Sequence, residues 1–584
     1  MVGGGEPRWA DRAAVNSSRR DADVEDAVES GIAGFERALA DIGTGQHHWN
    51  LGTVQPGVTP NPDVYFAGFS DQTKIGVSSP MRLSGLVLAA AVALVARPVK
   101  AQHIRAWRLA HEGTILREFT TLVSLPNVAS DSVNIRHNAD TLMAMLQRRG
   151  ISAQLLELPG SPPAVYGSLP APGATHTLVL YAHYDGQPVT PSDWSTPPWQ
   201  PVLRNGAEVV AIPTDGDTVP GETRLYGRSA SDDKAPIISM LAALDAVRAL
   251  GQQPSVNLKF YFEGEEEAGS THATAMLEKY RDLLKADAWL FCDGPIDQSG
   301  RPVVGFGVRG TVDVEMTVYG PARALHSGHY GNWAPNPISL LSSLLASMRT
   351  PDGQILVAGY MNDVRPLLPS ERAAIAKLPK PDSGLRQTLA LGASEANDAR
   401  LAERIMLPAI NFRGFQSGAV GDRAANAIPT EARASIDFRL VPNETPERVR
   451  ELIEAHIRRQ GFFLVHDSAD RATRLAHAKV IRLDWSHGYA AQRTSIDLPI
   501  SKAIERLVAE ASDRPLVVIP AMGGSLPMSE FESVLRRPLI NLPTVNYDNN
   551  QHAPNENTRL ANLWTAIEVF GHVMTNAGGA LKME

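Results

Sequence analysis

Apolar residues recur at helical spacing from about residue 112 onward, and short apolar runs separate the helical stretches. Ile115, Leu116, Phe119 and Leu122 would share one face of a first helix. The following chain alternates predicted helices with predicted strands, the helices at 133–149, 233–250 and 271–284 and the strands at 176–185, 255–262 and 287–293. This alternation predicts an α/β fold around a mostly parallel sheet, with functional groups at the carboxyl ends of its strands.

The pattern changes to strict two-residue alternation at 307–320 and again at 431–442. Such alternation is typical of antiparallel strands with one buried and one exposed face. A helix should follow the second strand, with Thr445 as N-cap and Pro446 in its first turn. We interpret 308–485 as an inserted α+β lid domain, which would also be the dimerisation domain. The catalytic domain would then comprise 104–307 and 486–584.

Composition limits the classes of site that this chain can carry. Its 584 residues exceed a single ordinary core, and 43% hydrophobic with 20% charged residues indicates a soluble globular protein. The net charge of −8, with no long basic run, argues against nucleic acid as the main partner. Because Cys292 is the single cysteine, any metal would be held by His, Asp and Glu.

The segment from Met81 to Gln102 has the layout of a secretory signal peptide. A short basic start precedes an apolar stretch over 86–96, and Ala101 is small. That stretch is shorter than the ~20 residues of a membrane span, so no stable span is predicted. We interpret 1–80 as a disordered or gene-model extension and expect a periplasmic or secreted enzyme. The alternatives are a buried core helix in this segment and a cytoplasmic location.

Acidic and histidine residues follow several of the predicted strands. The stretch "FEGEEEAGS" (262–270) follows one strand, "AHYDG" ends another, and Asp293 ends a third. Two further pieces are "SDDK", which contains Asp232, and "NYDNNQHAPNE", which contains His552 and Glu556. Taken singly, each piece also suits a solvated loop or a helix cap. Clustered carboxylates repel one another, however, unless a cation lies between them.

The order of these pieces resembles that of the M20 family of metallopeptidases, the carboxypeptidase, aminoacylase and carnosinase group. The resemblance covers about 112–584, and "FEGEEEAGS", "ALHSGHYGN" and "GGSLP" are most similar to its carnosinase-type dipeptidase branch. It implies two divalent metal ions sharing one aspartate. The implied ligands of the first ion are His183, Asp232 and Asp293, and those of the second are Asp232, Glu267 and His552.

The same resemblance assigns proton transfer to Glu266 as general base. A shift of one position, to Glu265 and Glu266, is the alternative alignment of this acidic run. Asp185 would accept the second N–H of the His183 imidazole and so fix its tautomer. Glu263 and Glu265 are expected to be solvated acids or acids around the ligands.

Substrate contacts are expected from the inserted domain and from one loop of the catalytic domain. His326 resembles the histidine that stabilises the oxyanion, reaching across from the partner subunit in dimeric members. Asn426 and Arg439 stand thirteen apart as in that family, where the arginine binds the free carboxylate of the substrate. Pairing of Arg439 with Asp437 is the structural alternative. Donors near that carboxylate would come from Gly524 and Ser525.

These assignments imply hydrolysis of an amide bond next to a free carboxylate, by a dipeptidase or a short-peptide carboxypeptidase. Zinc suits mixed His and carboxylate ligands, and manganese or cobalt could replace it. An N-acyl or N-carbamoyl amino acid amidohydrolase is the alternative enzyme, and a non-catalytic binding protein is the alternative of another class. A homodimer is expected, with a peptide or an N-acyl amino acid as substrate.

Overall fold

The first sheet has eight strands in the order β1-β2-β7-β3-β8-β20-β9-β19. In this computed structural model, which describes residues 101–583, the central strands β7, β3, β8 and β20 run parallel, whereas β1, β2 and β9 add antiparallel pairs. The predicted mixed α/β fold is thus confirmed. The strands are β1 (Ser152–Leu156), β2 (Ala164–Leu169), β3 (Thr177–His183), β7 (Asn257–Glu263), β8 (Ala288–Phe291), β9 (Val303–Gly305), β19 (Val517–Ile519) and β20 (Leu539–Asn541).

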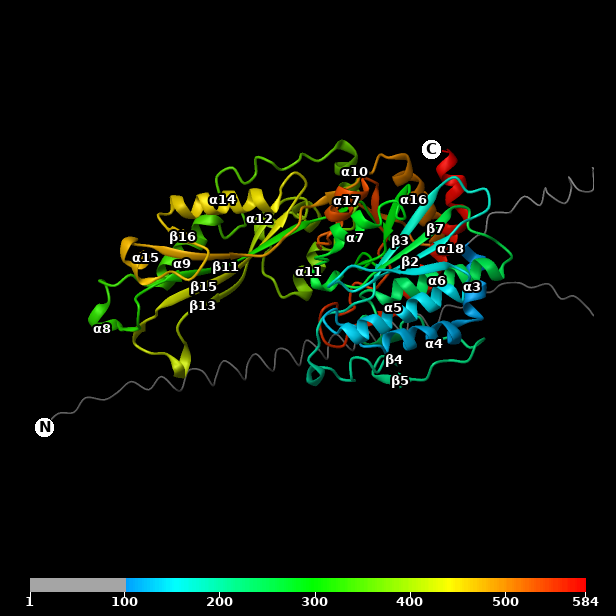
Figure 1. Cartoon of the computed structure of the whole chain (residues 1–584), viewed down its shortest axis with the longest axis horizontal. Helices are drawn as coiled ribbons and strands as arrows, with labels where there is room; N and C mark the ends of the chain where they lie inside the picture. The colour runs from blue at the N-terminus through cyan, green and yellow to red at the C-terminus, as the bar shows by residue number, and fades with distance from the viewer. Residues whose placement is uncertain (1–100, 584) are drawn as a thin grey trace, which may run out of the picture. The chain divides into compact units, whose positions relative to one another are not determined.

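Helices cover both faces of this sheet (Figure 1). Strand β3 shows why, because Leu178 and Leu180 belong to one buried cluster, whereas Val179 and Tyr181 belong to another. The first cluster holds side chains of α3 (Ala101–Leu109), α4 (Glu112–Val123), α5 (Ser132–Gln147), α6 (Lys234–Ala249), α16 (Pro499–Ala511) and α18 (Leu560–Met583). The second holds side chains of α7 (Ala273–Lys279) and α17 (Met528–Leu535).

The second sheet has five strands in the order β13-β15-β11-β17-β16. Its two long strands pair antiparallel from Gly310 opposite Leu440 to Tyr319 opposite Glu431. Helices α9 (Pro337–Met348) and α14 (Pro446–Arg459) pack on one face, and Thr445 caps α14 by accepting the N–H of Arg448. The strands are β11 (Gly310–Tyr319), β13 (Ala409–Gln416), β15 (Glu431–Leu440), β16 (Phe463–Val465) and β17 (Val480–Trp485).

The described chain also contains smaller sheets and short helices. A four-stranded sheet contains β4 (Val202–Asn205), β5 (Glu208–Val210), β6 (Arg224–Tyr226) and β21 (Asn557–Arg559), and two short pairs are β10 (Gly307–Val308) with β18 (Gln492–Arg493) and β12 (Leu325–His326) with β14 (Ala427–Ile428). Short helices follow α9, namely α10 (Pro369–Lys377), α11 (Asp382–Thr388), α12 (Glu395–Asp398) and α13 (Leu401–Arg404). All strands of the five-stranded sheet lie between residues 310 and 485, although the exact domain limits remain predictions.

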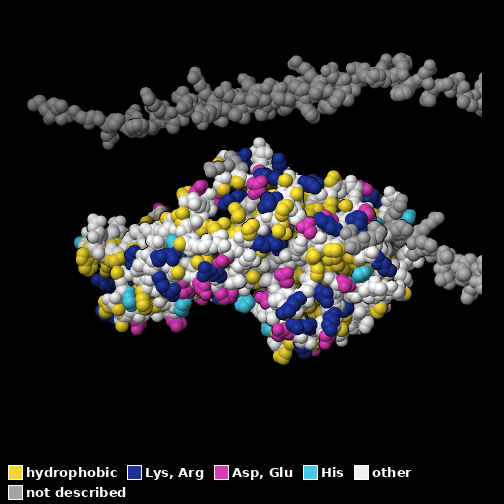
Figure 2. Space-filling view, turned by 90° about the horizontal axis from the view of Figure 1, so that it is seen from above, with side chains coloured by type: hydrophobic (Ala, Val, Ile, Leu, Met, Phe, Trp, Pro, Cys, Tyr) yellow, Lys and Arg dark blue, Asp and Glu magenta, His cyan; other side chains and the backbone are white. Residues whose placement is uncertain are grey.

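The proposed extension at 1–80 lies outside the described residues, as does all but the last two residues of the proposed signal peptide. Within 101–583, no helix combines the length and apolar character that crossing a membrane requires. On the face that Figure 2 shows, Lys and Arg side chains are interspersed with Asp and Glu side chains. This mixed surface is in keeping with the modest net charge.

Candidate metal centre and substrate cleft

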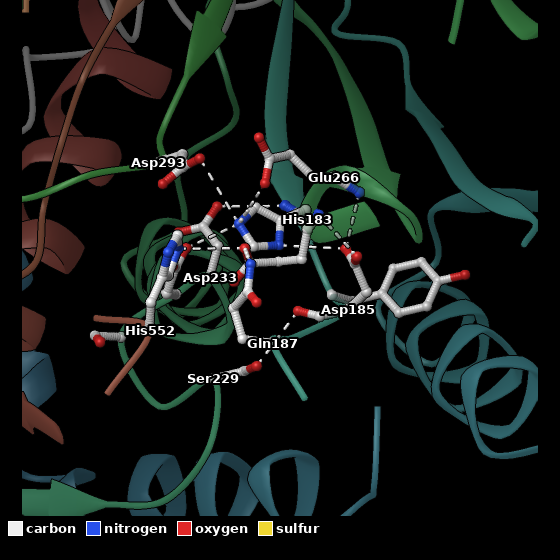
Figure 3. A network of polar contacts seen from close by, with 12 residues as sticks. His183, Asp185, Gln187, Ser229, Asp233, Glu266, Asp293 and His552 are labelled. Atoms are coloured by element: carbon white, nitrogen blue, oxygen red, sulfur yellow. Dashed lines mark hydrogen bonds and ion pairs between the residues drawn. The ribbon is translucent and has the colours of Figure 1, made fainter. Parts of the chain in front are cut away.

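The first group of candidate ligands lies at the carboxyl ends of β3 and β8. His183 is the last residue of β3, and Asp293 follows β8 by two positions. The Nε2 atom of His183 lies 3.7 Å from Oδ2 of Asp293 (Figure 3). The same atom lies 2.9 Å from Oδ1 of Asp232. All three side chains are buried. Parallel neighbours place their carboxyl ends at one edge of the sheet, which is why residues 110 apart in sequence meet here.

The second group shares Asp232 with the first. The Nε2 atom of His552 lies 3.1 Å from Oδ2 of Asp232 and 3.2 Å from Oε2 of Glu267. Within each group, the potential ligand atoms all lie within 4.8 Å of one another. One oxygen of Asp232 therefore faces the first group and the other oxygen faces the second, as a bridging carboxylate requires.

Asp185 connects the end of β3 with the acidic loop. Its Oδ1 atom lies 3.4 Å from Nδ1 of His183, and its two oxygens accept the backbone N–H groups of Glu266 and Glu267 at 3.1 and 2.9 Å. The carboxylate of Asp185 thus holds the loop by two hydrogen bonds and lies against the imidazole of His183. This contact leaves Nε2 of His183 directed at the shared aspartate.

The charges at this site fit a bound cation. Burial and the nearby Asp232 raise the pKa of Asp293 to about 7, and burial together with Asp293 and Glu267 raises the pKa of Glu266 well above its usual value. Hydrogen bonds to Asp232 and Glu267 raise the pKa of His552 to about 10. In the described part of the chain, the ion pairs of these carboxylates are with histidines and not with Lys or Arg. Divalent cations would therefore offset a negative charge that no nearby Lys or Arg neutralises.

Glu266 lies beside both groups but belongs to neither. Its Oε2 atom is 4.0 Å from Nε2 of His183, and its side chain is 12% exposed. Glu267, by contrast, accepts a 2.7 Å hydrogen bond from the Gln187 amide and faces His552. The acidic loop therefore presents two adjacent carboxylates in different settings. One lies among the potential metal ligands, and the other is available for proton transfer.

Glu263 and Glu265 were expected to be solvated acids or acids around the ligands, and the first of these two expectations is wrong. Both side chains are buried. Glu263 accepts a 2.8 Å hydrogen bond from the hydroxyl of Tyr181, and burial raises its pKa to about 7. Glu265 accepts the backbone N–H of His272 at 2.8 Å and also contacts its ring. Glu263 is buried because it ends β7, an internal strand of the sheet, and Glu265 is held by the backbone at the start of α7.

A cleft of about 520 Å³ adjoins the two groups. Arg439 lies on its wall, where Nη1 donates to Oγ of Ser525 at 2.8 Å while Nε and Nη2 donate to Asp437 at 3.2 and 3.1 Å. The substrate-binding role and the pairing with Asp437, which the sequence presented as alternatives, are thus geometrically compatible. The cleft is lined by Asp232, Glu266, Asp293, Gly294, Pro295, Val308, Arg439, Met522, Gly523, Gly524, Ser525, Leu526, Gln551 and His552.

His326 and Asn426 do not line this cleft. His326 lies on β12 with an exposed side chain, and the backbone carbonyl of Asn426 accepts the N–H of Ser327 at 2.8 Å. The Nδ1 atom of His326 accepts the N–H of Gly328 at 3.1 Å. The neutral ring therefore carries its proton on Nε2, and this N–H has no hydrogen-bond partner within residues 101–583.

Glu556 is a residue whose role sequence reasoning missed. Its buried carboxylate accepts the backbone N–H groups of Ser229, Ser231 and Asp232, each at 2.9 Å. It also accepts 2.8 Å bonds from the hydroxyl of Ser231 and from Nη1 of Arg228. The loop that carries the shared aspartate is therefore fixed by one distant side chain. Its proximity to His552 in "HAPNE" was the available signal.

A Cys-Gly metallodipeptidase, dug1 of Schizosaccharomyces pombe, is 29% identical over 417 residues, which cover 70% of this chain and 81% of that protein. The human Beta-Ala-His dipeptidase is 26% identical over 419 residues, covering 70% and 75% respectively. The crystal structure of the M20 family metallo-carboxypeptidase Sso-CP2 from Sulfolobus solfataricus matches with a TM-score of 0.66 and 27% identity, over 79% of this chain and 98% of that one. The family profile of peptidase family M20/M25/M40 matches residues 179–576, and the chain belongs to that family.

Proposed function

We propose that this peptidase hydrolyses dipeptides or short peptides at the amide bond next to a free C-terminal carboxylate. One observation carries the proposal. The cleft that holds the candidate metal ligands and Glu266 is also lined by Arg439 and Ser525. A planar guanidinium matches the two oxygens of a carboxylate, so a substrate anchored there would place its amide bond toward Glu266. The metallodipeptidases among the similar proteins support the same substrate class.

The two groups sharing Asp232 would hold two divalent cations, and we propose zinc because His and carboxylate ligands suit it. When bound, the cations would polarise the substrate carbonyl and lower the pKa of the attacking water. Glu266 would take a proton from that water and transfer it to the leaving amine. Asp185 would keep His183 in the required tautomer, and the Arg439–Ser525 pair would hold the substrate carboxylate.

Hydrolysis of matched substrates tests this proposal. We expect cleavage of a dipeptide panel, and at least tenfold weaker kcat/KM on the same dipeptides with amidated C-termini. The Glu266→Gln variant should retain its metal content and lose most of its kcat, since the isosteric amide cannot accept the proton. Preference for N-acetyl or N-carbamoyl amino acids over dipeptides would instead identify an amidohydrolase. Absence of any hydrolysis by the metal-loaded protein would contradict the proposal.

We further propose a homodimer in which His326 of each chain acts in the cleft of the partner subunit. Two features support this, namely the exposed position of His326 on β12 and its free Nε2–H donor. In that position the donor would stabilise the oxyanion of the tetrahedral intermediate.

Mixing two inactive variants tests the dimer directly. If sites are shared, random pairing of His326→Ala chains with Glu266→Gln chains should restore about one quarter of wild-type activity, because half of the dimers then hold one intact site. Each variant alone should stay inactive. If size measurements show mixed dimers but the mixture regains no activity, His326 does not act in the cleft of the partner subunit.

A further inference from the structure

Tyr489 lies in a row of residues that crosses the five-stranded sheet beside the cleft. Thr311 of β11 pairs with Arg439 of β15 on one side and with Tyr489 on the other. The pair with Tyr489 has both backbone hydrogen bonds, at 3.0 and 2.9 Å. Residues directly opposite in antiparallel pairs direct their side chains to the same face. Tyr489 and Arg439 therefore project from the same face, two strands apart.

This face is the one that meets the cleft. The next pair in register, Val312 with Phe438, belongs to the buried cluster under α9 and α14 on the opposite face. Gly488 makes the approach of Tyr489 to β11 possible, because it has a φ of +72° and a Cβ there would lie 2.7 Å from the carbonyl oxygen of Thr311. Backbone geometry thus places Tyr489 in the same row as Arg439.

Tyr489 is not itself among the residues that line the cleft, but three residues that do, namely Glu266, Asp293 and Arg439, lie close enough to affect its hydroxyl. Burial raises the pKa of the Tyr489 hydroxyl most, Glu266 and Asp293 raise it further, and Arg439 lowers it. The phenol is therefore protonated at neutral pH and can donate a hydrogen bond. It has no hydrogen-bond partner among residues 101–583.

Arg439 alone does not saturate a bound carboxylate. A guanidinium has five N–H groups, whereas a carboxylate accepts at about four sites. Three of the Arg439 donors are already directed at Asp437 and Ser525, which leaves two. A further neutral donor on the same face would complete the site without adding charge.

We propose that the Tyr489 hydroxyl donates a hydrogen bond to the C-terminal carboxylate of the substrate, beside Arg439, and so contributes to specificity for free peptides. This inference rests on the proposed function. No role in proton transfer is assigned to the phenol.

Calorimetric binding separates this inference from the hydrolytic activity. The metal-loaded Glu266→Gln protein is titrated with a dipeptide and with its C-terminal amide, with and without the added Tyr489→Phe substitution. Loss of a hydrogen bond to a charged group should weaken binding of the free acid about tenfold or more, and binding of the amide should weaken by less because its neutral carbonyl accepts a weaker hydrogen bond. The matched control is Tyr547→Phe, an exposed tyrosine with 45% relative exposure. Its binding of both ligands should equal that of the Glu266→Gln protein.

Kinetics provide a second readout on the wild-type background. Tyr489→Phe should raise KM about tenfold for the free dipeptide with kcat within about twofold, because the contact is present before and during the reaction. Equal affinities with and without the hydroxyl, equal losses for acid and amide, or a fall in kcat at constant KM would each overturn the inference. A wild-type protein that binds dipeptides with this tyrosine dependence but hydrolyses none would contradict the proposed function and leave the carboxylate contact standing.

Discussion

The interaction of Glu556 with the Asp232 loop allows a quantitative prediction. In Glu556→Gln, an NH₂ group replaces one carboxylate oxygen without changing the shape of the side chain. Whichever oxygen is replaced, at least two hydrogen bonds are lost, either those from Arg228 and Ser229 or those from Ser231 and Asp232. The new N–H groups then also face other donors.

The size of the effect follows from the burial of these groups. Hydrogen bonds to charged groups contribute about 1.5–3 kcal/mol each, and the loss would leave buried donors unpaired. We therefore expect a decrease of roughly 3–5 kcal/mol in the free energy of unfolding. Because the loop carries the shared aspartate, metal affinity should fall about 10- to 100-fold.

Guanidinium unfolding and competition with a fluorescent chelator measure the two quantities. Glu278→Gln, on the exposed side of α7, is the matched control and should change neither. A Glu556→Gln protein with wild-type stability and wild-type metal affinity would refute the reasoning. Loss of stability with unchanged affinity would limit Glu556 to a purely structural role.

Three further predictions concern other parts of the molecule. Burial raises the pKa of Glu444 to about 7, so the contribution of its carboxyl group favours folding at low pH and is lost as the pH rises through 7. Glu444→Gln should therefore remove up to ~3 kcal/mol of the fall in unfolding free energy between pH 5 and pH 8. The same pH dependence of the unfolding free energy in both proteins would contradict this. A Cβ on Gly523 would lie 3.2 Å from Cδ1 of Ile405, so Gly523→Val should shift the loop at 522–526, which lines the cleft, and raise KM about 3- to 10-fold. Adding Ile405→Ala should partly restore KM, and no recovery would refute the expected steric conflict. Removal of metal by a chelator should lower the Tm by several degrees in calorimetry, and addition of zinc should restore the original Tm. A Tm that changes under neither treatment would argue against a metal site in the folded state.

The local pattern of apolar and polar residues was sufficient to predict the helices and strands that carry the site. The helix capped by Thr445 follows from residues next to one another in sequence, and so does the position of His183 at the end of a buried strand. The pairing of the two long strands was suggested by their matching alternation. The periodic pattern thus predicted the edge of the sheet at which the candidate metal ligands meet.

Long-range register was beyond the reach of local pattern. The contact of Glu556 with the Asp232 loop joins positions 324 apart, and the row from Arg439 to Tyr489 depends on which residues pair across three strands. The burial of Glu263 was missed for the same reason, because its partner Tyr181 lies on a neighbouring strand. The segment at 350–410 carries no recognisable chemistry, and the packing of its Ile405 in a cluster with Ala521, next to the loop at 522–526 that lines the cleft, becomes visible only after folding.

Anomalous X-ray scattering from crystals of the zinc-loaded protein tests the shared-aspartate centre most directly. We predict two anomalous peaks per chain, one contacted by His183, Asp232 and Asp293 and the other by Asp232, Glu267 and His552. A single peak, or two peaks without a common aspartate, would contradict the account.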